Sequence, residues 1–262
     1  MAELINTNFK EEYKKLNTLQ REAVDAIDGP VMVVAGPGTG KTQILALRIG
    51  NILSQTDTKA DSILCLTFTN SAVKAMRDRL YKYIGSEGLK VHISTFHGFG
   101  LEILEKYYHV LDLDRTPKLM DGEDSVSLCD EILHNNDWTY LRPRSDTSRY
   151  FRDLKSLVSL LKRERILPED FASKIELEIQ GLRLDPESIS SRGETKGQLK
   201  KDVEKKIESL SRSLEAVKFY EMYEQYKKDR NLFDYDDILE SLNKIVEISD
   251  EAKSFIKENY LY

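Results

Sequence analysis

The sequence predicts an α/β fold in which a parallel sheet flanked by helices carries a mostly helical insertion. Over the first hundred residues, short apolar runs alternate with segments of helical periodicity. Strands that alternate with helices of this length are typical of a parallel sheet. From about residue 110 onward, β-branched runs become rare and charged residues frequent, which indicates helices without a large sheet.

Three short apolar runs are the predicted strands: Val31–Val34, Ser62–Phe68 and Val91–Phe96. The first run is fully apolar and ends in a glycine-rich turn, which suits a buried parallel strand. A helix over Thr42–Leu53 is expected after the first strand, and another that ends near Tyr108 after the third. Asn70 follows the second strand and offers an N-cap oxygen for the helix between them.

The insertion is expected to occupy residues 110–214, so that residues 1–109 and 215–262 form the α/β domain. Helical periodicity covers Val126–Leu133 and Phe151–Leu161, and it resumes at Leu199. The polar stretch 181–197 is predicted to be a loop between two helices.

The composition is that of a globular chain, with 40% hydrophobic and 32% charged residues among 262. No stretch approaches the roughly 20 apolar residues that cross a bilayer, and the N-terminus does not read as a secretory signal. Cys65 and Cys129 have no Cys or His nearby at metal-ligand spacing. We therefore expect reduced thiols in a cytoplasmic protein without a membrane partner.

The net charge of −6 and the pI near 5.5 disfavour nucleic acid as a partner when they are taken alone. Basic residues nevertheless concentrate between positions 142 and 165, where only three acids accompany them. They are Arg142, Arg144, Arg149, Arg152, Lys155, Lys162, Arg163 and Arg165. On charge alone, this stretch fits a basic binding face and a solvated helix face equally well.

Residues 35–42 read Ala-Gly-Pro-Gly-Thr-Gly-Lys-Thr and stand between a predicted strand and a predicted helix. This is a Walker A loop with Ala35 at its first position, where the strict pattern has glycine. Its glycines let successive backbone N–H groups converge on phosphate oxygens, beside the positive end of a helix dipole. Lys41 and Thr42 are the expected catalytic residues, with Lys41 on the β- and γ-phosphates of ATP and the Thr42 hydroxyl on Mg²⁺. The expected phosphate contacts are Ala35, Gly36, Pro37, Gly38, Thr39, Gly40, Lys41 and Thr42.

Two predicted strands end in similar polar blocks, Leu66–Ala72 and Ile93–Gly98. Ligands of open α/β sheets bind beyond the carboxyl ends of the strands. Hydroxyl groups and a histidine there suit phosphate contacts, and an aromatic ring suits stacking on an unpaired base. Core packing is the simpler interpretation of Phe68 and Phe96 without further context.

Gln20 precedes the loop and carries a carboxamide, whose adjacent donor and acceptor complement the N6 and N7 edge of adenine. Gln20, the loop 35–42 and the blocks Thr67–Asn70 and Ser94–Gly98 together resemble the UvrD/Rep/PcrA family of superfamily 1 DNA helicases. Tyr226–Leu239 resembles the segment just before that family's Walker B motif. The resemblance covers roughly residues 12–108 and 215–245.

The resemblance implies a RecA-like motor domain that binds ATP and Mg²⁺, with Gln20 on adenine and the insertion at the DNA duplex. The family often has arginine where this chain has Gln43, so that one expected nucleotide contact is altered. It also often has lysine at Ser71 and glutamate at Ala75. The implied contacts to single-stranded DNA are Thr67, Phe68, Asn70, Thr95 and His97.

By the same resemblance, the parent would unwind DNA 3′ to 5′ at junctions of single and double strands, in repair or recombination. The family's Walker B motif would follow Tyr262, so the chain is expected to be an N-terminal fragment without that motif and without the second motor domain. Thr42 alone should then bind Mg²⁺ weakly, and negligible ATPase activity is expected of the fragment. Asp234, Asp236 and Asp237 do not replace that motif, and we interpret them as the capped start of a helix near Asp236.

Three other functions remain open. A small-molecule P-loop kinase would transfer phosphate to a nucleoside monophosphate without binding DNA. A non-motor module would bind DNA without using ATP. The motor part of a recombination helicase–nuclease would differ from a helicase only in residues beyond position 262.

Overall fold

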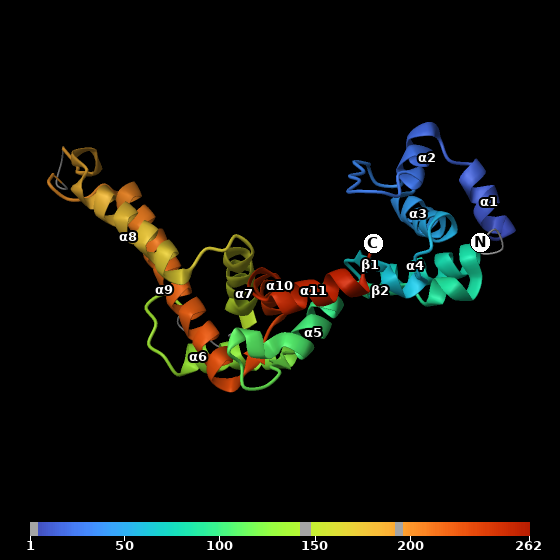
Figure 1. Ribbon diagram of the computed structural model, residues 1–262. Helices are drawn as coiled ribbons and strands as arrows, with labels where there is room; N and C mark the ends of the chain where they lie inside the picture. The colour runs from blue at the N-terminus through green and yellow to red at the C-terminus, as the bar shows by residue number, and fades with distance from the viewer. Residues whose placement is uncertain (1–4, 142–147, 192–195) are drawn as a thin grey trace. The chain divides into compact units, whose positions relative to one another are not determined.

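The computed structural model describes residues 5–141, 148–191 and 196–262, and the chain divides into two compact units (Figure 1). Unit 1 comprises Met1–Arg115 and Ile238–Tyr262, and unit 2 comprises Thr116–Asp237. The protein is a mostly helical α/β protein with two small parallel sheets, one in each unit. The predicted α/β class is therefore correct, although each sheet in the described part of the chain has two strands.

The sheet of unit 1 pairs β1 (Leu64–Thr67) with β2 (His92–Thr95) in parallel, so that Thr67 lies opposite Thr95. The crossover between them is α4 (Asn70–Ile84) and a 3-10 turn over Gly85–Leu89. The expectation that Asn70 caps α4 is wrong. Thr69 is the N-cap, because its extended backbone lets its hydroxyl accept a hydrogen bond from the Ala72 N–H.

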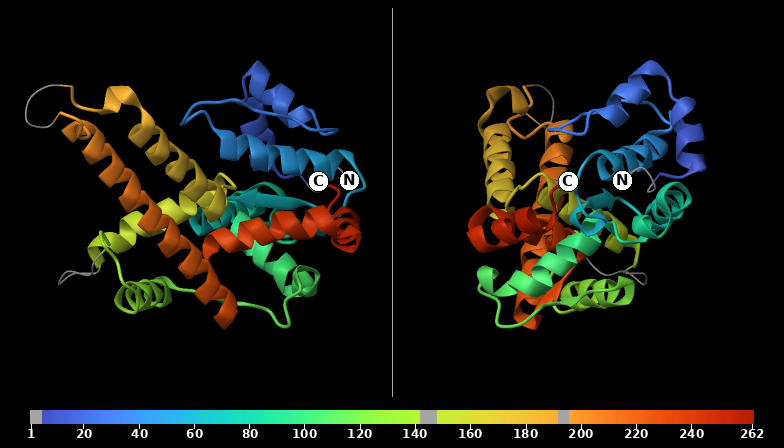
Figure 2. Two further views of the ribbon diagram at one scale, coloured as in Figure 1. Left: turned by 90° about the vertical axis from the view of Figure 1, so that its left-hand side faces the viewer. Right: turned by 45° about the vertical axis from the view of Figure 1, so that its right-hand side comes forward.

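Three helices before β1 contribute to the core of unit 1: α1 (Thr7–Lys14), α2 (Thr18–Asp25) and α3 (Lys41–Gln55). α3 is buried along the face that carries Ala46, Leu47 and Ile49, and Val24 of α2 joins the same cluster. A 3-10 turn over Ala60–Ser62 leads into β1. α3 lies alongside this sheet (Figure 2), and a cavity of about 480 Å³ between α3 and β1 is lined mainly by aliphatic side chains.

The predicted strand Val31–Val34 does not form. Val31 and Val33 face a cavity beside Ile44 of α3, whereas Met32 and Val34 are 86% and 85% exposed. A buried strand needs neighbours that pair with its N–H and C=O groups. Among the described residues no strand pairs with this run, so its apolar side chains do not bring it into a sheet.

The end of the chain lies along the free edge of β1. The Leu64 N–H donates to the Tyr262 carbonyl at 2.8 Å, and the Leu261 N–H donates to the Ser62 carbonyl at 2.9 Å. Two helices precede this edge, α10 (Tyr235–Ile248) and α11 (Asp250–Asn259). Unit 1 also contains α5 (Phe96–Tyr107), which a 3-10 turn over Tyr108–Leu111 follows.

The described residues of unit 2 include four long helices: α6 (Gly122–His134), α7 (Ser148–Arg163), α8 (Pro168–Leu184) and α9 (Lys201–Arg230). Its sheet pairs β3 (Lys118–Leu119) with β4 (Leu232–Phe233) in parallel. α8 and α9 run side by side (Figures 1 and 2). Their contact is apolar and includes Ile175, Ile179, Ile207 and Val217.

The predicted loop 181–197 is shorter than expected, because α8 continues through Gly181 to Leu184. A 3-10 turn over Pro186–Ser188 and an antiparallel bridge between Ile189 and Leu199 follow, and residues 192–195 lie outside the described residues. α9 is one continuous helix within unit 2, which extends to Asp237. The division into a motor domain and an insertion over residues 110–214 stays a prediction. No helix in the described ranges combines the length and the apolar character that crossing a membrane requires.

Candidate functional site

The glycine-rich loop leads directly into α3. Gly38 and Gly40 have φ angles of 76° and 80°, in the left-handed region that favours glycine. Gly40 is also the N-cap of α3, and it has no side chain to cover the first turn. The positive end of the α3 dipole therefore faces the loop, as an anion site requires.

Lys41 links the two ends of this loop. Its Nζ donates to the carbonyl oxygens of Ala35 at 3.0 Å and Gly36 at 2.6 Å, and the Thr39 hydroxyl donates to the same Gly36 oxygen at 2.8 Å. Lys41 and Thr42 are both exposed. The structure thus brings both expected catalytic residues to the surface at the positive end of α3.

Gln20 ties α2 to the loop. It forms a capping box with Asn17, in which its Oε1 accepts from the Asn17 N–H at 3.0 Å. Its Nε2 donates to the Thr39 carbonyl at 3.2 Å. In the sequence, Gln20 merely precedes the loop. In the structure, the two are in direct contact.

A second carboxamide, that of Gln43, lies in the first turn of α3 beside the loop. Nε2 of Gln43 donates to Oε2 of Glu12 at 2.6 Å, which joins the first turn of α3 to α1. Sequence reasoning missed Glu12, since it lies on a short helix outside every motif. No motif or periodicity in the sequence links Glu12 to Gln43, so their contact could not be predicted.

The polar blocks after β1 and β2 meet at one edge, because Thr67 and Thr95 occupy the same register. Phe68 is 87% exposed, and its ring centroid lies 5.1 Å from that of Phe96. Core packing is therefore the wrong interpretation of Phe68. Its exposed ring is available to a partner in solution.

The hydroxyls at this edge also organise the backbone. The Thr67 hydroxyl donates to the Thr69 carbonyl at 3.0 Å, and the Thr95 hydroxyl caps α5 by accepting from the Gly98 N–H at 2.9 Å. Asn70 is exposed at the start of α4, and His97 is half-buried in the first turn of α5. All five expected DNA contacts thus lie in or next to the two strand ends.

A groove of about 770 Å³ runs along α7 in unit 2. It is lined by Phe151, Arg152, Lys155, Ser156, Ser159, Leu160 and Arg163, and we call it the basic groove. Only some basic residues of the stretch 142–165 are known to line this groove. The Lys162 side chain is 4% exposed, and Arg142, Arg144 and the Arg149 side chain lie outside the described residues.

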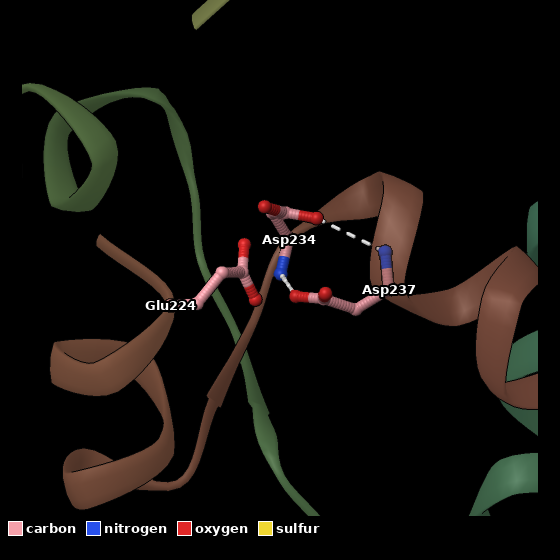
Figure 3. Close-up of side chains that lie close together, drawn as sticks. All are labelled: Glu224, Asp234 and Asp237. Carbon is pink, nitrogen blue, oxygen red and sulfur yellow. Dashed lines mark hydrogen bonds between the residues drawn. The ribbon is translucent and has the colours of Figure 1, made fainter. Parts of the chain in front are cut away.

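Unit 2 also contains three clustered carboxylates, Glu224, Asp234 and Asp237 (Figure 3). Asp234 and Asp237 form a reciprocal cap, in which the Asp234 N–H donates to Asp237 Oδ2 at 2.7 Å and the Asp237 N–H to Asp234 Oδ1 at 3.0 Å. This arrangement confirms the expected capped helix start, with Tyr235 as the first residue of α10.

Two lysine ammonium groups stand among these carboxylates. Nζ of Lys227 lies 2.9 Å from Glu224, 2.9 Å from Asp234 and 2.7 Å from Asp237, and Lys162 contacts the same three side chains. Burial alone would raise the pKa of Asp234, but the two ammonium groups hold it well below its usual range. A divalent cation would have to displace both lysines, so the cluster is not a suitable metal centre.

Comparison with known proteins gives one family and several relatives. The UvrD/REP helicase N-terminal domain family matches residues 16–262. A protein of Buchnera aphidicola named ATP-dependent DNA helicase Rep is 28% identical over 228 residues, which are 86% of this chain and 29% of the relative.

Two proteins named ATP-dependent DNA helicase PcrA are also similar. The one from Staphylococcus aureus is 34% identical over 120 residues, 46% of this chain and 16% of the relative. The one from Staphylococcus epidermidis is 33% identical over 158 residues, 60% of this chain and 21% of the relative. The matched part of this chain spans less than a third of the length of each relative.

Proposed function

The chain belongs to the UvrD/REP helicase N-terminal domain family, and from this premise we propose that it is the ATP-binding part of an ATP-dependent DNA helicase. The main support is that unit 1 carries both a glycine loop at the start of α3 and an exposed aromatic ring at the strand ends. The first suits a triphosphate, and the second suits an unpaired base.

In this proposal the backbone N–H groups of residues 35–40 and the start of α3 hold the phosphates of ATP. Lys41 exchanges the carbonyls of Ala35 and Gly36 for the β- and γ-phosphate oxygens, which are stronger acceptors because they are charged. Thr42 is exposed in the first turn of α3 and offers the hydroxyl oxygen that Mg²⁺ prefers as a ligand. Gln20 and Gln43 lie on the side of the loop where we place the base.

Single-stranded DNA would pass over the edge at the ends of β1 and β2. Phe68, backed by the Phe96 ring, provides a surface on which one base stacks. Thr67, Asn70, Thr95 and His97 are at the same edge and would contact the sugar–phosphate chain. Stacking does not distinguish bases, which suits a protein that moves along any sequence.

We further propose that unit 1 is the RecA-like motor domain and that unit 2 is its inserted helical subdomain. The basic groove of α7 would contact the duplex ahead of the junction, because Arg152 and Lys155 are exposed there. The whole protein would move 3′ to 5′ in the cytoplasm, in DNA repair or recombination. Since this chain spans less than a third of its relatives, we place the second motor domain outside these residues.

ATP hydrolysis would supply the free energy for translocation, with the nucleotide held between the two motor domains. We expect these 262 residues to bind ATP without efficient turnover. The carboxylate that orients the attacking water would belong to a Walker B motif, and we find no such motif among these residues. A steady-state rate on the order of one per second for this chain would contradict that part of the proposal.

Fluorescence anisotropy of labelled single-stranded DNA across a salt series tests the DNA part. We expect binding that weakens steeply with salt, and we expect Phe68→Ala to weaken it roughly 5- to 100-fold by removing one base stack. Tyr81→Ala is the matched control, because Tyr81 is an exposed aromatic residue of α4 outside the strand ends.

Equal loss in both variants, or unchanged binding in Phe68→Ala, would place the DNA path elsewhere. Phosphoryl transfer to a nucleoside monophosphate without any DNA binding would instead favour the small-molecule kinase.

A further inference from the structure

The contact between Glu12 and Gln43 determines which atom of the Gln43 carboxamide faces the loop. An ionised carboxylate only accepts hydrogen bonds, so Gln43 must present Nε2 to Glu12, at the observed distance of 2.6 Å. Lys15 donates to the other oxygen of Glu12 at 2.7 Å. That bond lowers the pKa of Glu12, so the side chain is ionised at neutral pH. Oε1 of Gln43 is therefore turned away from Glu12.

The atoms turned toward the loop come from two glutamines. A Cβ atom placed on Gly40 would lie 3.9 Å from Oε1 of Gln43 and 3.8 Å from Nε2 of Gln20. One acceptor and one donor thus flank the last glycine of the phosphate loop. Oε1 of Gln20 already accepts from the Asn17 N–H, so Gln20 turns its NH₂ group toward this side. One hydrogen of that group donates to the Thr39 carbonyl, and the second is left to donate to a ligand.

Adenine and guanine present opposite groups at position 6 to such a pair. Adenine has a donor at its 6-amino group beside a ring nitrogen acceptor, whereas guanine has an acceptor, O6, at the same position. Oε1 of Gln43 would accept from the 6-amino group, and Nε2 of Gln20 would donate to the ring nitrogen. The O6 atom of guanine would meet a second oxygen and leave both without a hydrogen bond.

We propose that Glu12 is a positioning residue that makes the nucleotide site selective for adenine. It does so by preventing the Gln43 carboxamide from turning over and offering its NH₂ group to O6 of guanine. This inference rests on the proposed ATP site and adds the reason for its choice of base. Glu12 itself acts only through Gln43 and does not touch the nucleotide.

Equilibrium titration of the whole chain with fluorescent N-methylanthraniloyl derivatives of ATP and GTP tests the inference. The wild type should prefer ATP, and Glu12→Ala should reduce the ratio of the two affinities roughly tenfold, mainly by tighter binding of GTP. General damage to the fold would weaken both nucleotides and leave the ratio unchanged. Glu11→Ala is the matched control, because Glu11 is the exposed neighbour of Glu12.

Glu12→Gln provides a second variant that conserves size if Glu12→Ala does not fold. Its carboxamide both donates and accepts, so it tolerates either orientation of Gln43 and should lower the ratio as well. An unchanged ratio in a folded Glu12 variant, with ATP still bound, would overturn the inference alone. No binding of either nucleotide to the folded wild type would overturn the proposed ATP site and the inference with it.

Discussion

Nζ of Lys227 lies 2.7 Å from Oδ2 of Asp237, and the two side chains are 2% and 12% exposed. The pair joins the last third of α9 to the first turn of α10 within unit 2. An ammonium group of this kind is compensated only by its neighbours, since water has little access to it. We therefore expect unit 2 to depend on this lysine more than on any surface charge.

Lys227→Met should lower the free energy of unfolding by about 3–5 kcal/mol, because it leaves buried carboxylates without one of their two cations. Urea denaturation followed by circular dichroism measures the change. Lys228→Met is the matched control, since Lys228 is exposed on the same helix, and its effect should stay within about 0.5 kcal/mol. Equal effects of the two substitutions would show that the buried pair contributes no more than a surface lysine.

The same cluster predicts sensitivity to acid. The pKa of Asp234 in the folded chain is below its unfolded value near 3.9. Its stabilising contribution is therefore complete above about pH 4 and is lost as the pH falls through the folded pKa. The urea midpoint should decrease below about pH 4, and Asp234→Asn should make that decrease smaller. Asp236→Asn, two positions further along the chain, should leave the dependence of the urea midpoint on pH as it is in the wild type. If the urea midpoint of Asp234→Asn depended on pH as that of the wild type does, Asp234 would not be the source of the acid sensitivity.

Lys41→Ala should weaken ATP binding roughly 10- to 100-fold, because hydrogen bonds to a charged group contribute about 1.5–3 kcal/mol. Titration with a fluorescent ATP derivative measures it. Lys41 is exposed, so the fold should be unaffected. Lys59→Ala, at an exposed lysine after α3, should bind ATP as the wild type does. If both variants bind equally well, the loop does not use Lys41 for phosphate.

Arg152→Ala combined with Lys155→Ala should reduce the slope of log affinity against log salt by about 1–2 for DNA with a single-strand to duplex junction. Each side chain would otherwise release counterions from about one phosphate. The measurement is anisotropy with a junction and with a single strand, and the effect should be confined to the junction. Lys174→Ala, on α8, should change neither slope. A loss of equal size on both DNAs would contradict a role for the basic groove in duplex contact.

Val31–Val34 should exchange their backbone amide hydrogens much faster than β1, because no strand pairs with this run in the described chain. Hydrogen exchange measured by mass spectrometry resolves the two segments. Slow exchange at both would show that Val31–Val34 is paired in solution, as the apolar pattern alone predicts.

Local patterns in the sequence determined most of the elements. The helices that begin at Lys41 and Asn70, and the strands that end at Thr67 and Thr95, follow the predicted alternation. The glycine spacing of residues 35–42 likewise determined the loop, because left-handed φ angles at Gly38 and Gly40 are a local requirement. Helical periodicity also identified α6, α7 and α9 without any knowledge of their partners.

Only the tertiary structure decided which side chains became buried or paired. Val31–Val34 has the composition of a strand but no partner, since strand formation depends on hydrogen bonds to residues far away in the sequence. Lys162 belongs to a basic run, yet packing turns it inward to the carboxylates of α9 and α10. Phe68 looks like a core residue and is exposed, and Glu12 reaches Gln43 across 31 positions. Contacts between distant segments leave no periodic trace in a single sequence, and for that reason these four outcomes required the folded chain.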